Sequence, residues 1–309
     1  MKNLCPPALQ INDTLGLVAP SSPLTVGRLE PGCRYLVKQG FNVKKGSYLK
    51  SVNRFLAGED KCRAKDIMDF FYDPTVKAII ATAGGYGSQR LLPHLDYSFI
   101  QKNPKALVGF SDTTALQLGL FKQTGLVSYS GFTLRDTQHE VVEPLIERTL
   151  ISCLKNEAYE VKEGVSLRGG KVEGPLIGGT LSLIVALMGT PYQPDFKGSI
   201  LFFEEVWAEP FQIDSMLSQL ELAGVFEVVN GIIVGKFEHC VAKHQPERDG
   251  TVEDVIEEWK DRWRVPCLKD FPYGHGDRRC VLPIGKTVKV DVDQATLTVP
   301  PSFLIPMTR

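Results

Sequence analysis

A serine stands where the sequence changes from strand to helix periodicity. Ser111 follows the apolar run 106–109 and precedes a helix-patterned segment that Gly125 closes. A strand–turn–helix of this kind lifts the hydroxyl above a sheet and directs the next backbone N–H and the helix dipole at a developing oxyanion. Ser111 is therefore a candidate nucleophile. The alternative is a helix N-cap, because Ser and Asp are common there.

A cluster of glycines follows another apolar run. Gly84, Gly85 and Gly87 would let backbone amides approach a ligand and donate to an anion, as in an oxyanion hole. Their spacing does not fit a dinucleotide fingerprint, because the position of the third required glycine is Arg90. The structural alternative is a tight turn between a strand and a helix.

Two carboxylates and a histidine supply acid–base groups. Glu204 and Glu205 end the apolar run 200–203, and since adjacent strand residues point to opposite faces, only one can face a given site. His275 has glycine on both sides, which leaves room for a substrate beside the imidazole. A solvated strand end and an exposed loop histidine are the alternatives. With Ser111 these residues follow the Ser…Asp/Glu…His order of α/β hydrolases.

The sequence gives little support for a metal-binding site or a nucleotide-binding site. His239, Cys240 and His244 match no established metal-ligand spacing. The segment 285–287 mimics the end of a phosphate-binding loop, but the position of the required first glycine is Cys280. We therefore expect no metal and no cofactor.

Length and composition indicate the general class of protein to which these residues belong. The chain has 309 residues, 35 Lys+Arg against 36 Asp+Glu and 43% apolar content, which excludes disorder throughout and predicts one large or two ordinary domains. The near-neutral charge and the absence of a basic run argue against nucleic-acid binding. The partner we expect is a small molecule.

The apolar runs and the cysteines indicate the cellular compartment of the protein. Pro6 and Pro7 interrupt the N-terminal apolar stretch that a signal peptide would need. The apolar-leaning stretch 175–192 contains three glycines, and it has too few consecutive apolar residues to cross a membrane as a helix. The seven cysteines are scattered and never spaced C-x-x-C, which suits reduced thiols. We expect a cytoplasmic protein that does not contact a membrane.

The secondary-structure pattern predicts an α/β protein. Short β-branched runs alternate with helical periodicity in the first half, which is typical of a parallel sheet covered by helices. We expect these strands at 15–19, 41–43, 76–82, 106–109 and 126–129. Further predicted strands are 165–167, 200–203 and 231–234, with a hairpin-like 281–292 that turns at Gly285, and predicted helices are 144–154, 181–188, 215–222 and 252–263.

A loop-rich connection near 156–170 divides the chain. We place the domain boundary there, with a first domain of residues 1–155 that carries Ser111 and a second of residues 156–309 that carries the glutamates and His275. These three side chains can therefore meet only in a groove between the two domains.

Many ordered blocks of the sequence resemble the LD-carboxypeptidase family of serine peptidases, which includes murein tetrapeptide carboxypeptidases and microcin C self-immunity peptidases. The match runs over most of the chain. Its blocks are Gly16-Leu17-Val18-Ala19-Pro20-Ser21-Ser22-Pro23, Phe55-Leu56-Ala57-Gly58, Asp73-Pro74, Lys77-Ala78-Ile79, Gly84-Gly85-Tyr86-Gly87, Val108-Gly109-Phe110-Ser111-Asp112, Gly178-Gly179-Thr180-Leu181-Ser182-Leu183, Gly189-Thr190-Pro191-Tyr192, Leu201-Phe202-Phe203-Glu204-Glu205-Val206, Ile213-Asp214 and Gly274-His275.

The resemblance implies a fold and a set of catalytic roles. It implies a flavodoxin-like N-terminal domain and a smaller α/β C-terminal domain with the active site between them. Ser111 would be the nucleophile, His275 the general base and then acid, and Glu204, rather than Glu205, would orient the imidazole. Backbone amides of Gly85 and Asp112 would form the oxyanion hole.

The resemblance also implies a substrate. Family members cleave the bond between an L-centre and a D-amino acid and release terminal D-Ala from murein tetrapeptide during cytoplasmic recycling. Arg90 and Trp207 are candidates for binding the substrate, and relatives form homodimers. The alternatives are an amidase that detoxifies a peptidyl-nucleotide antibiotic and a peptide-binding relative without turnover.

Three departures from the family pattern fall near the expected groove. Ala83 stands where many members carry Arg, residues 130–132 (Ser-Gly-Phe) replace a His-Gly-Pro block, and Thr180 replaces a common Asn. None removes a triad residue. The sequence therefore supports hydrolysis more strongly than it supports any particular substrate.

Overall fold

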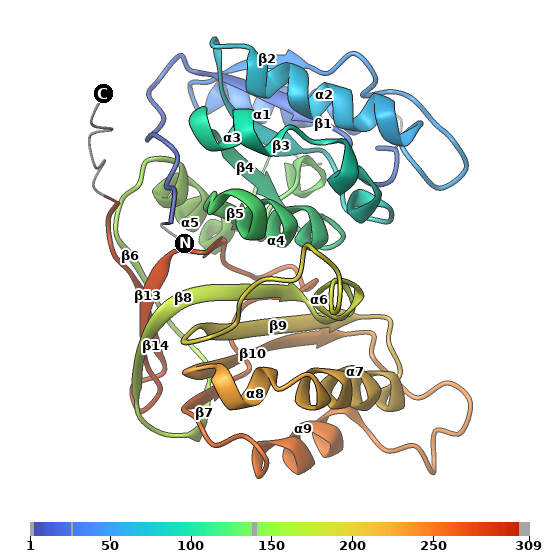
Figure 1. The fold of residues 1–309 in the computed structure, drawn as a ribbon, viewed down its shortest axis with the longest axis vertical. Coiled ribbons are helices and arrows are strands. Elements are labelled where there is room, and N and C mark those ends of the chain that lie inside the picture. Colours follow the sequence, from blue (N-terminus) through green and yellow to red (C-terminus); the bar gives the residue numbers. More distant parts are fainter. Residues whose placement is uncertain (1–2, 26, 138–140, 303–309) are drawn as a thin grey trace.

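Two sheets form the body of the protein and lie one beside the other in the computed structural model (Figure 1). The structure describes residues 3–25, 27–137 and 141–302. No helix within these residues is long and apolar enough to cross a membrane.

Five of the six strands of the first sheet are parallel and follow the order β2-β1-β3-β4-β5. This is the flavodoxin-like order, so the prediction of the first domain's fold is confirmed. In such sheets ligands bind beyond the carboxyl ends of the strands where the order reverses, here between β1 and β3. The strands are β1 (Thr14–Val18), β2 (Asn42–Lys45), β3 (Val76–Ala81), β4 (Ala106–Gly109) and β5 (Ser128–Ser130).

Helices cover this sheet and connect its strands (Figure 1). β4 is buried at every residue, as expected of a central parallel strand with helices on both faces. α4 is buried over most of its length because it also packs against the second sheet and α6. The helices are α1 (Leu29–Lys38), α2 (Asp60–Tyr72), α3 (Tyr97–Lys102), α4 (Thr113–Thr124) and α5 (Pro144–Leu154), with 3-10 turns η1 (Ser88–His94) and η2 (Leu134–Thr137).

The second sheet is mixed, with the order β6-β14-β13-β8-β9-β10-β11-β7. Its centre, β8 to β11, is parallel, and the flanking strands pair antiparallel. The strands are β6 (Tyr159–Lys162), β7 (Val165–Arg168), β8 (Lys171–Thr180), β9 (Ile200–Val206), β10 (Gly231–Glu238), β11 (Cys267–Lys269), β13 (Thr287–Asp291) and β14 (Thr296–Val299).

Two capped helices and two short ones accompany this sheet. Glu209 and Gln212 form a capping box at the start of α7, and Thr251 and Asp254 form another at α9, so the first backbone N–H groups of both helices have acceptors. The helices are α6 (Leu181–Ala186), α7 (Pro210–Leu222), α8 (Val225–Val228) and α9 (Val252–Lys260).

The predicted hairpin at 281–292 is wrong. β12 (Leu282–Ile284) pairs antiparallel with β5 in the first sheet, whereas β13 pairs with β8 and β14 in the second. Gly285, with φ 89°, lies where the chain passes from one sheet to the other, and a Cβ there would be 2.3 Å from the Phe121 ring. The first sheet thus takes a strand from the last part of the chain and ties the two halves together.

Candidate active site

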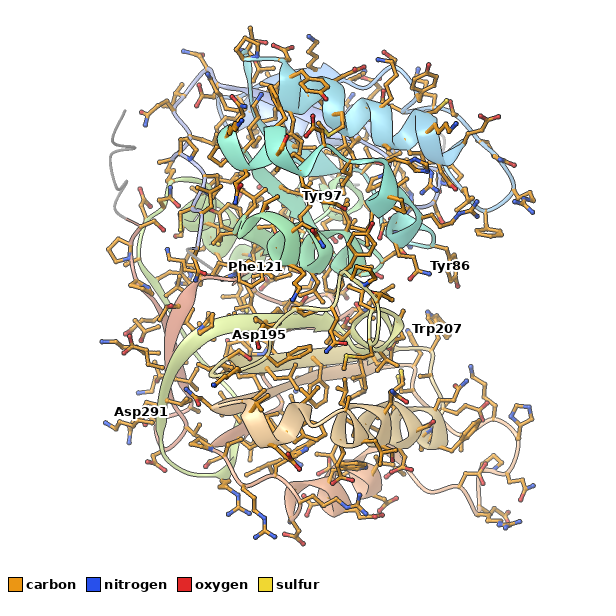
Figure 2. All side chains as sticks on the ribbon, viewed as in Figure 1. Tyr86, Tyr97, Phe121, Asp195, Trp207 and Asp291 are labelled. Atoms are coloured by element: carbon orange, nitrogen blue, oxygen red, sulfur yellow. The ribbon has the colours of Figure 1, made fainter. Side chains whose placement is uncertain are left out.

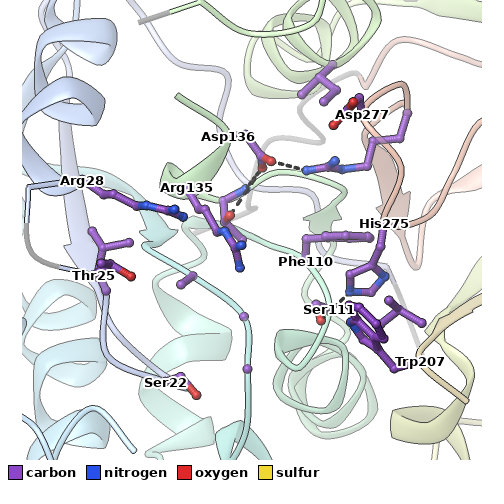
Figure 3. A pocket seen from close by; sticks show the side chains of 18 of the residues that line it. Ser22, Thr25, Arg28, Phe110, Ser111, Arg135, Asp136, Trp207, His275 and Asp277 are labelled. Atoms are coloured by element: carbon purple, nitrogen blue, oxygen red, sulfur yellow. Dashed lines mark hydrogen bonds and ion pairs between the residues drawn. The ribbon is translucent and has the colours of Figure 1, made fainter. Parts of the chain in front are cut away.

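Three side chains from distant parts of the chain form a continuous hydrogen-bonded series. Ser111 Oγ lies 2.8 Å from His275 Nε2, and His275 Nδ1 lies 2.7 Å from Glu204 Oε2. Ser111 follows a strand of the first sheet, and the other two come from the second part of the chain, so the series bridges the two halves. Figure 3 shows Ser111 beside His275. A hydroxyl, an imidazole and a carboxylate at these distances can act as nucleophile, base and orienting group.

Ser111 occupies a strained turn between β4 and α4. Its φ is 64°, a left-handed conformation that costs a residue other than glycine about 1 to 3 kcal/mol. The turn is tight enough that a Cβ on Gly109 would lie 2.4 Å from Thr113 Oγ1. This conformation lifts the Ser111 hydroxyl above the carboxyl end of β4, as the strand–turn–helix pattern predicts.

Glu204 is fully buried near the end of β9, and Glu205 points to the opposite face of that strand. Glu204 Oε1 accepts a hydrogen bond of 2.6 Å from Thr180 Oγ1, so both carboxylate oxygens have partners. Glu205 instead accepts from the backbone N–H groups of Ser182 and Val206, at 2.7 and 2.9 Å. Burial raises the pKa of the Glu205 carboxyl. The strand's alternation decides which glutamate meets the histidine.

His275 is held on its ring face as well as at its nitrogens. The Phe110 ring lies 4.7 Å from the imidazole, between centroids, and 5.7 Å from the buried Tyr273 ring. The Tyr273 hydroxyl is 2.8 Å from Ser130 Oγ in the first sheet. Because the His275 side chain is 20% exposed, it can contact both the buried carboxylate and a substrate.

The glycine loop after β3 lies directly against Ser111. A Cβ on Gly84 would be 2.8 Å from Ser111 Cβ, and one on Gly85, whose φ is 114°, would be 2.1 Å from Ser22 Oγ. Among the described residues, neither the Gly85 nor the Asp112 backbone N–H has an acceptor. Two free N–H donors next to a serine hydroxyl are what an oxyanion hole requires.

The Asp112 side chain fastens this loop in place. Its carboxylate accepts from the backbone N–H groups of Gly87 and Ser88 at 3.1 and 2.8 Å, and its backbone carbonyl accepts from Ser88 Oγ. The sequence predicts a backbone role for Asp112. The structure adds this side-chain role, which depends on a loop more than 20 residues away.

A cavity of about 670 Å³ opens at Ser111. Ser111, His275, Gly85 and Trp207 line it, and the Trp207 ring, 61% exposed, stacks on His239 at 4.4 Å between centroids. Figure 2 shows Trp207 and the exposed Tyr86 on the same side of the molecule, one from each half of the chain. The cavity therefore draws on both halves.

Arg90, the other predicted substrate-binding residue, does not line this cavity. Its guanidinium pairs with Asp60, with Nε at 2.9 Å and an Nη at 2.8 Å. The same carboxylate also pairs with the buried Arg63. Arg90 thus takes part in a charge cluster at the start of α2.

The three departures from the family pattern occupy different places. Ala83 lines the cavity. Ser130 and Phe132 are buried behind it, and Thr180 contacts the Glu204 carboxylate. Only the departure at Ala83 therefore changes the cavity wall directly.

Sequence reasoning missed the charged wall of the cavity. Arg28, Arg135, Asp136 and Arg279 all line it. Arg279 pairs with Asp136 and lies over the Phe110 ring at 4.6 Å. No local pattern marks these residues, because they come from three separate segments that only the fold brings together.

The fold and the site together define an α/β protein with two sheets, in which side chains from both halves of the chain form a serine–histidine–glutamate series. Profiles for the LD-carboxypeptidase N-terminal domain and C-terminal domain match residues 15–131 and 173–290. The chain belongs to the LD-carboxypeptidase family, and is accordingly a peptidase of the hydrolase class.

Individual relatives match over nearly the whole chain. A probable murein peptide carboxypeptidase of Bacillus subtilis is 35% identical, covering 96% of this chain and 94% of that protein. Murein tetrapeptide carboxypeptidase of Pseudomonas aeruginosa is 30% identical, covering 91% and 94%. The structure of the microcin C7 self-immunity protein MccF without ligand superimposes with a TM-score of 0.88 at 28% identity, covering 97% of this chain and 99% of that one.

Proposed function

We propose that the chain is a serine-type LD-carboxypeptidase that releases terminal D-Ala from murein tetrapeptide in cell-wall recycling. The observation that carries this proposal is the series Ser111–His275–Glu204, with contacts of 2.8 and 2.7 Å, at the floor of a cavity. Two relatives are named for murein peptides, which favours that substrate.

In the acylation step Ser111 Oγ attacks the carbonyl carbon of the L,D-bond. Its proton passes to His275 Nε2, 2.8 Å away, and the carbonyl oxygen becomes an oxyanion that the N–H groups of Gly85 and Asp112 stabilise. When the tetrahedral intermediate collapses, the C–N bond breaks and His275 gives its proton to the departing amine of D-Ala. The peptide remains as an ester of Ser111.

In the deacylation step water replaces the serine hydroxyl as nucleophile. His275 takes a proton from the water, which attacks the ester carbonyl, and then returns the proton to Ser111 Oγ as the ester bond breaks. The Glu204 carboxylate stabilises the transient imidazolium. Thr180 holds the second carboxylate oxygen, so the imidazole keeps one orientation.

Trp207 supplies the contact that we propose for the substrate outside the reacting bond. Its ring is exposed in the cavity and is kept in place by stacking on His239. An aromatic face of this kind can pack against the apolar parts of a peptide. We further propose that the enzyme is cytoplasmic, where murein fragments are recycled, and that it is a homodimer, as the family resemblance implies.

The test is the identification of products by mass. Purified protein incubated with murein tripeptide, tetrapeptide and pentapeptide should convert only tetrapeptide, to tripeptide and free D-Ala, and Ser111→Ala should convert none. Turnover by Ser111→Ala at the parent rate would contradict the serine assignment. Absence of turnover on all three peptides would contradict the proposed substrate.

A second candidate is hydrolysis of a peptidyl-nucleotide antibiotic. The superposition on MccF favours it, because that protein confers self-immunity to microcin C7. Comparing kcat/KM for murein tetrapeptide and for an aminoacyl sulfamoyl nucleoside would decide between the two substrates. A peptide-binding relative without turnover would bind both and hydrolyse neither.

A further inference from the structure

Two arginines in the cavity wall have no carboxylate partner among the residues that the structure describes. Of the guanidinium groups that line the cavity, Arg279 pairs with Asp136. Arg28 and Arg135 have no hydrogen-bond or ion-pair partner for their side chains among the described residues. The positive charge of these two groups is therefore available to a ligand.

The two groups come from different segments and reach the same space. Arg28 immediately precedes α1, and Arg135 lies in η2, after β5. Figure 3 shows both side chains extending into the cavity, on the side away from His275. Arg135 is exposed and Arg28 half-buried, so both can reach a molecule in the cavity.

The carboxylates of the cavity do not neutralise them. Asp136 is taken by Arg279, and Glu143 accepts from the start of α5 and pairs with Arg278 at 2.8 Å. Asp277 is exposed two residues beyond His275, and its carboxylate forms no ion pair with either arginine. Within the described part of the chain, no carboxylate is therefore paired with Arg28 or Arg135.

We propose that Arg28 and Arg135 bind a carboxylate of the peptide substrate and fix the peptide relative to Ser111. The proposal rests on the proposed function, because murein tetrapeptide carries one carboxylate on its terminal D-Ala and others on the residues that precede the scissile bond. A planar guanidinium matches a carboxylate with two parallel N–H···O bonds, which sets direction as well as affinity. Two such groups on one wall select an anionic peptide over its amide.

The test combines charge removal on the enzyme with charge removal on the peptide. The double variant Arg28→Gln with Arg135→Gln is assayed on the free-acid tetrapeptide, on its C-terminal carboxamide, and on an analogue whose carboxylates preceding the scissile bond are amidated. For the free acid we expect KM to rise about 10- to 100-fold with kcat little changed, the usual effect of losing charged hydrogen bonds.

The analogues show which carboxylate is bound. One of the two amides should have a raised KM with the parent enzyme, and the double variant should not raise that KM further. Arg135→Lys keeps the positive charge but loses the two parallel N–H donors of the guanidinium group. It should therefore bind the free acid less tightly than the parent enzyme but more tightly than the double variant. The control Arg262→Gln, which removes the same charge at a guanidinium paired with Glu221 away from the cavity, should leave KM unchanged.

Two results would overturn the subsite: an unchanged KM for the free acid in the double variant, or equal discrimination between acid and both amides by parent and variant. A binding measurement tests the carboxylate subsite independently of the proposed hydrolysis. Calorimetric titration of Ser111→Ala with the tetrapeptide, with and without the two arginines, needs no turnover. A weakening of about tenfold or more on removing the arginines supports the subsite even if no peptide is hydrolysed, and equal affinities refute it.

Discussion

The neighbouring glutamates of β9 offer a matched pair for testing the catalytic series. Glu204→Gln keeps the shape of the side chain but removes the negative charge 2.7 Å from His275 Nδ1. With charge centres about 4 Å apart at an effective dielectric near 20, the lost attraction to the imidazolium is about 4 kcal/mol, or about 1000-fold in rate. The amide can also donate to Nδ1 and favour the wrong tautomer, and a comparable change in a serine protease costs about 10,000-fold.

We therefore expect kcat for D-Ala release to fall about 1000- to 10,000-fold in Glu204→Gln, measured by steady-state kinetics with the protein's circular dichroism unchanged. Glu205→Gln is the control, because its side chain accepts from the backbone N–H groups of Ser182 and Val206 on the opposite face of the strand. It should lower kcat by less than about tenfold. Equal losses in the two variants, or near-parental activity in Glu204→Gln, would refute the reasoning.

Three further substitutions probe the supports of the site. Thr180→Val removes the hydrogen bond to the Glu204 carboxylate and should lower kcat about tenfold or more with little change in KM. Gly84→Ala places a methyl group 2.8 Å from Cβ of the nucleophile, so it should lower kcat about 100-fold with a modest loss in Tm; parental kcat would contradict this. Ser130→Ala leaves the buried Tyr273 hydroxyl without its partner and should lower the free energy of unfolding in urea by about 1 to 3 kcal/mol.

The sequence predicts the local part of the site well. The turn at Ser111 depends on residues adjacent in the chain, and β4 occurs at the predicted residues 106–109. The pairing of His275 with Glu204 and Ser111 joins residues 71 and 164 positions apart. No periodicity carries such information, so these roles depended on the family resemblance.

The second half was harder to predict because packing overrides local preference there. β8 was missed since its sequence, KVEGPLIGGT, is rich in Gly and Pro, which are poor strand formers. Gly178 is required there because a Cβ would lie 1.7 Å from the Phe202 carbonyl oxygen in β9. The error at 281–292 has a similar origin: two strands joined by a glycine look like a hairpin unless the separate partners of each are known.

The central claim is that Ser111 is an activated nucleophile, and covalent labelling tests it most directly. A fluorophosphonate probe followed by peptide mapping should modify Ser111 in the parent enzyme, and His275→Ala should remove that labelling because the base is lost. The nearby hydroxyls of Ser22 and Ser88 should stay unmodified. An enzyme that releases D-Ala while Ser111 remains unlabelled, or that is labelled at another serine, would contradict the account.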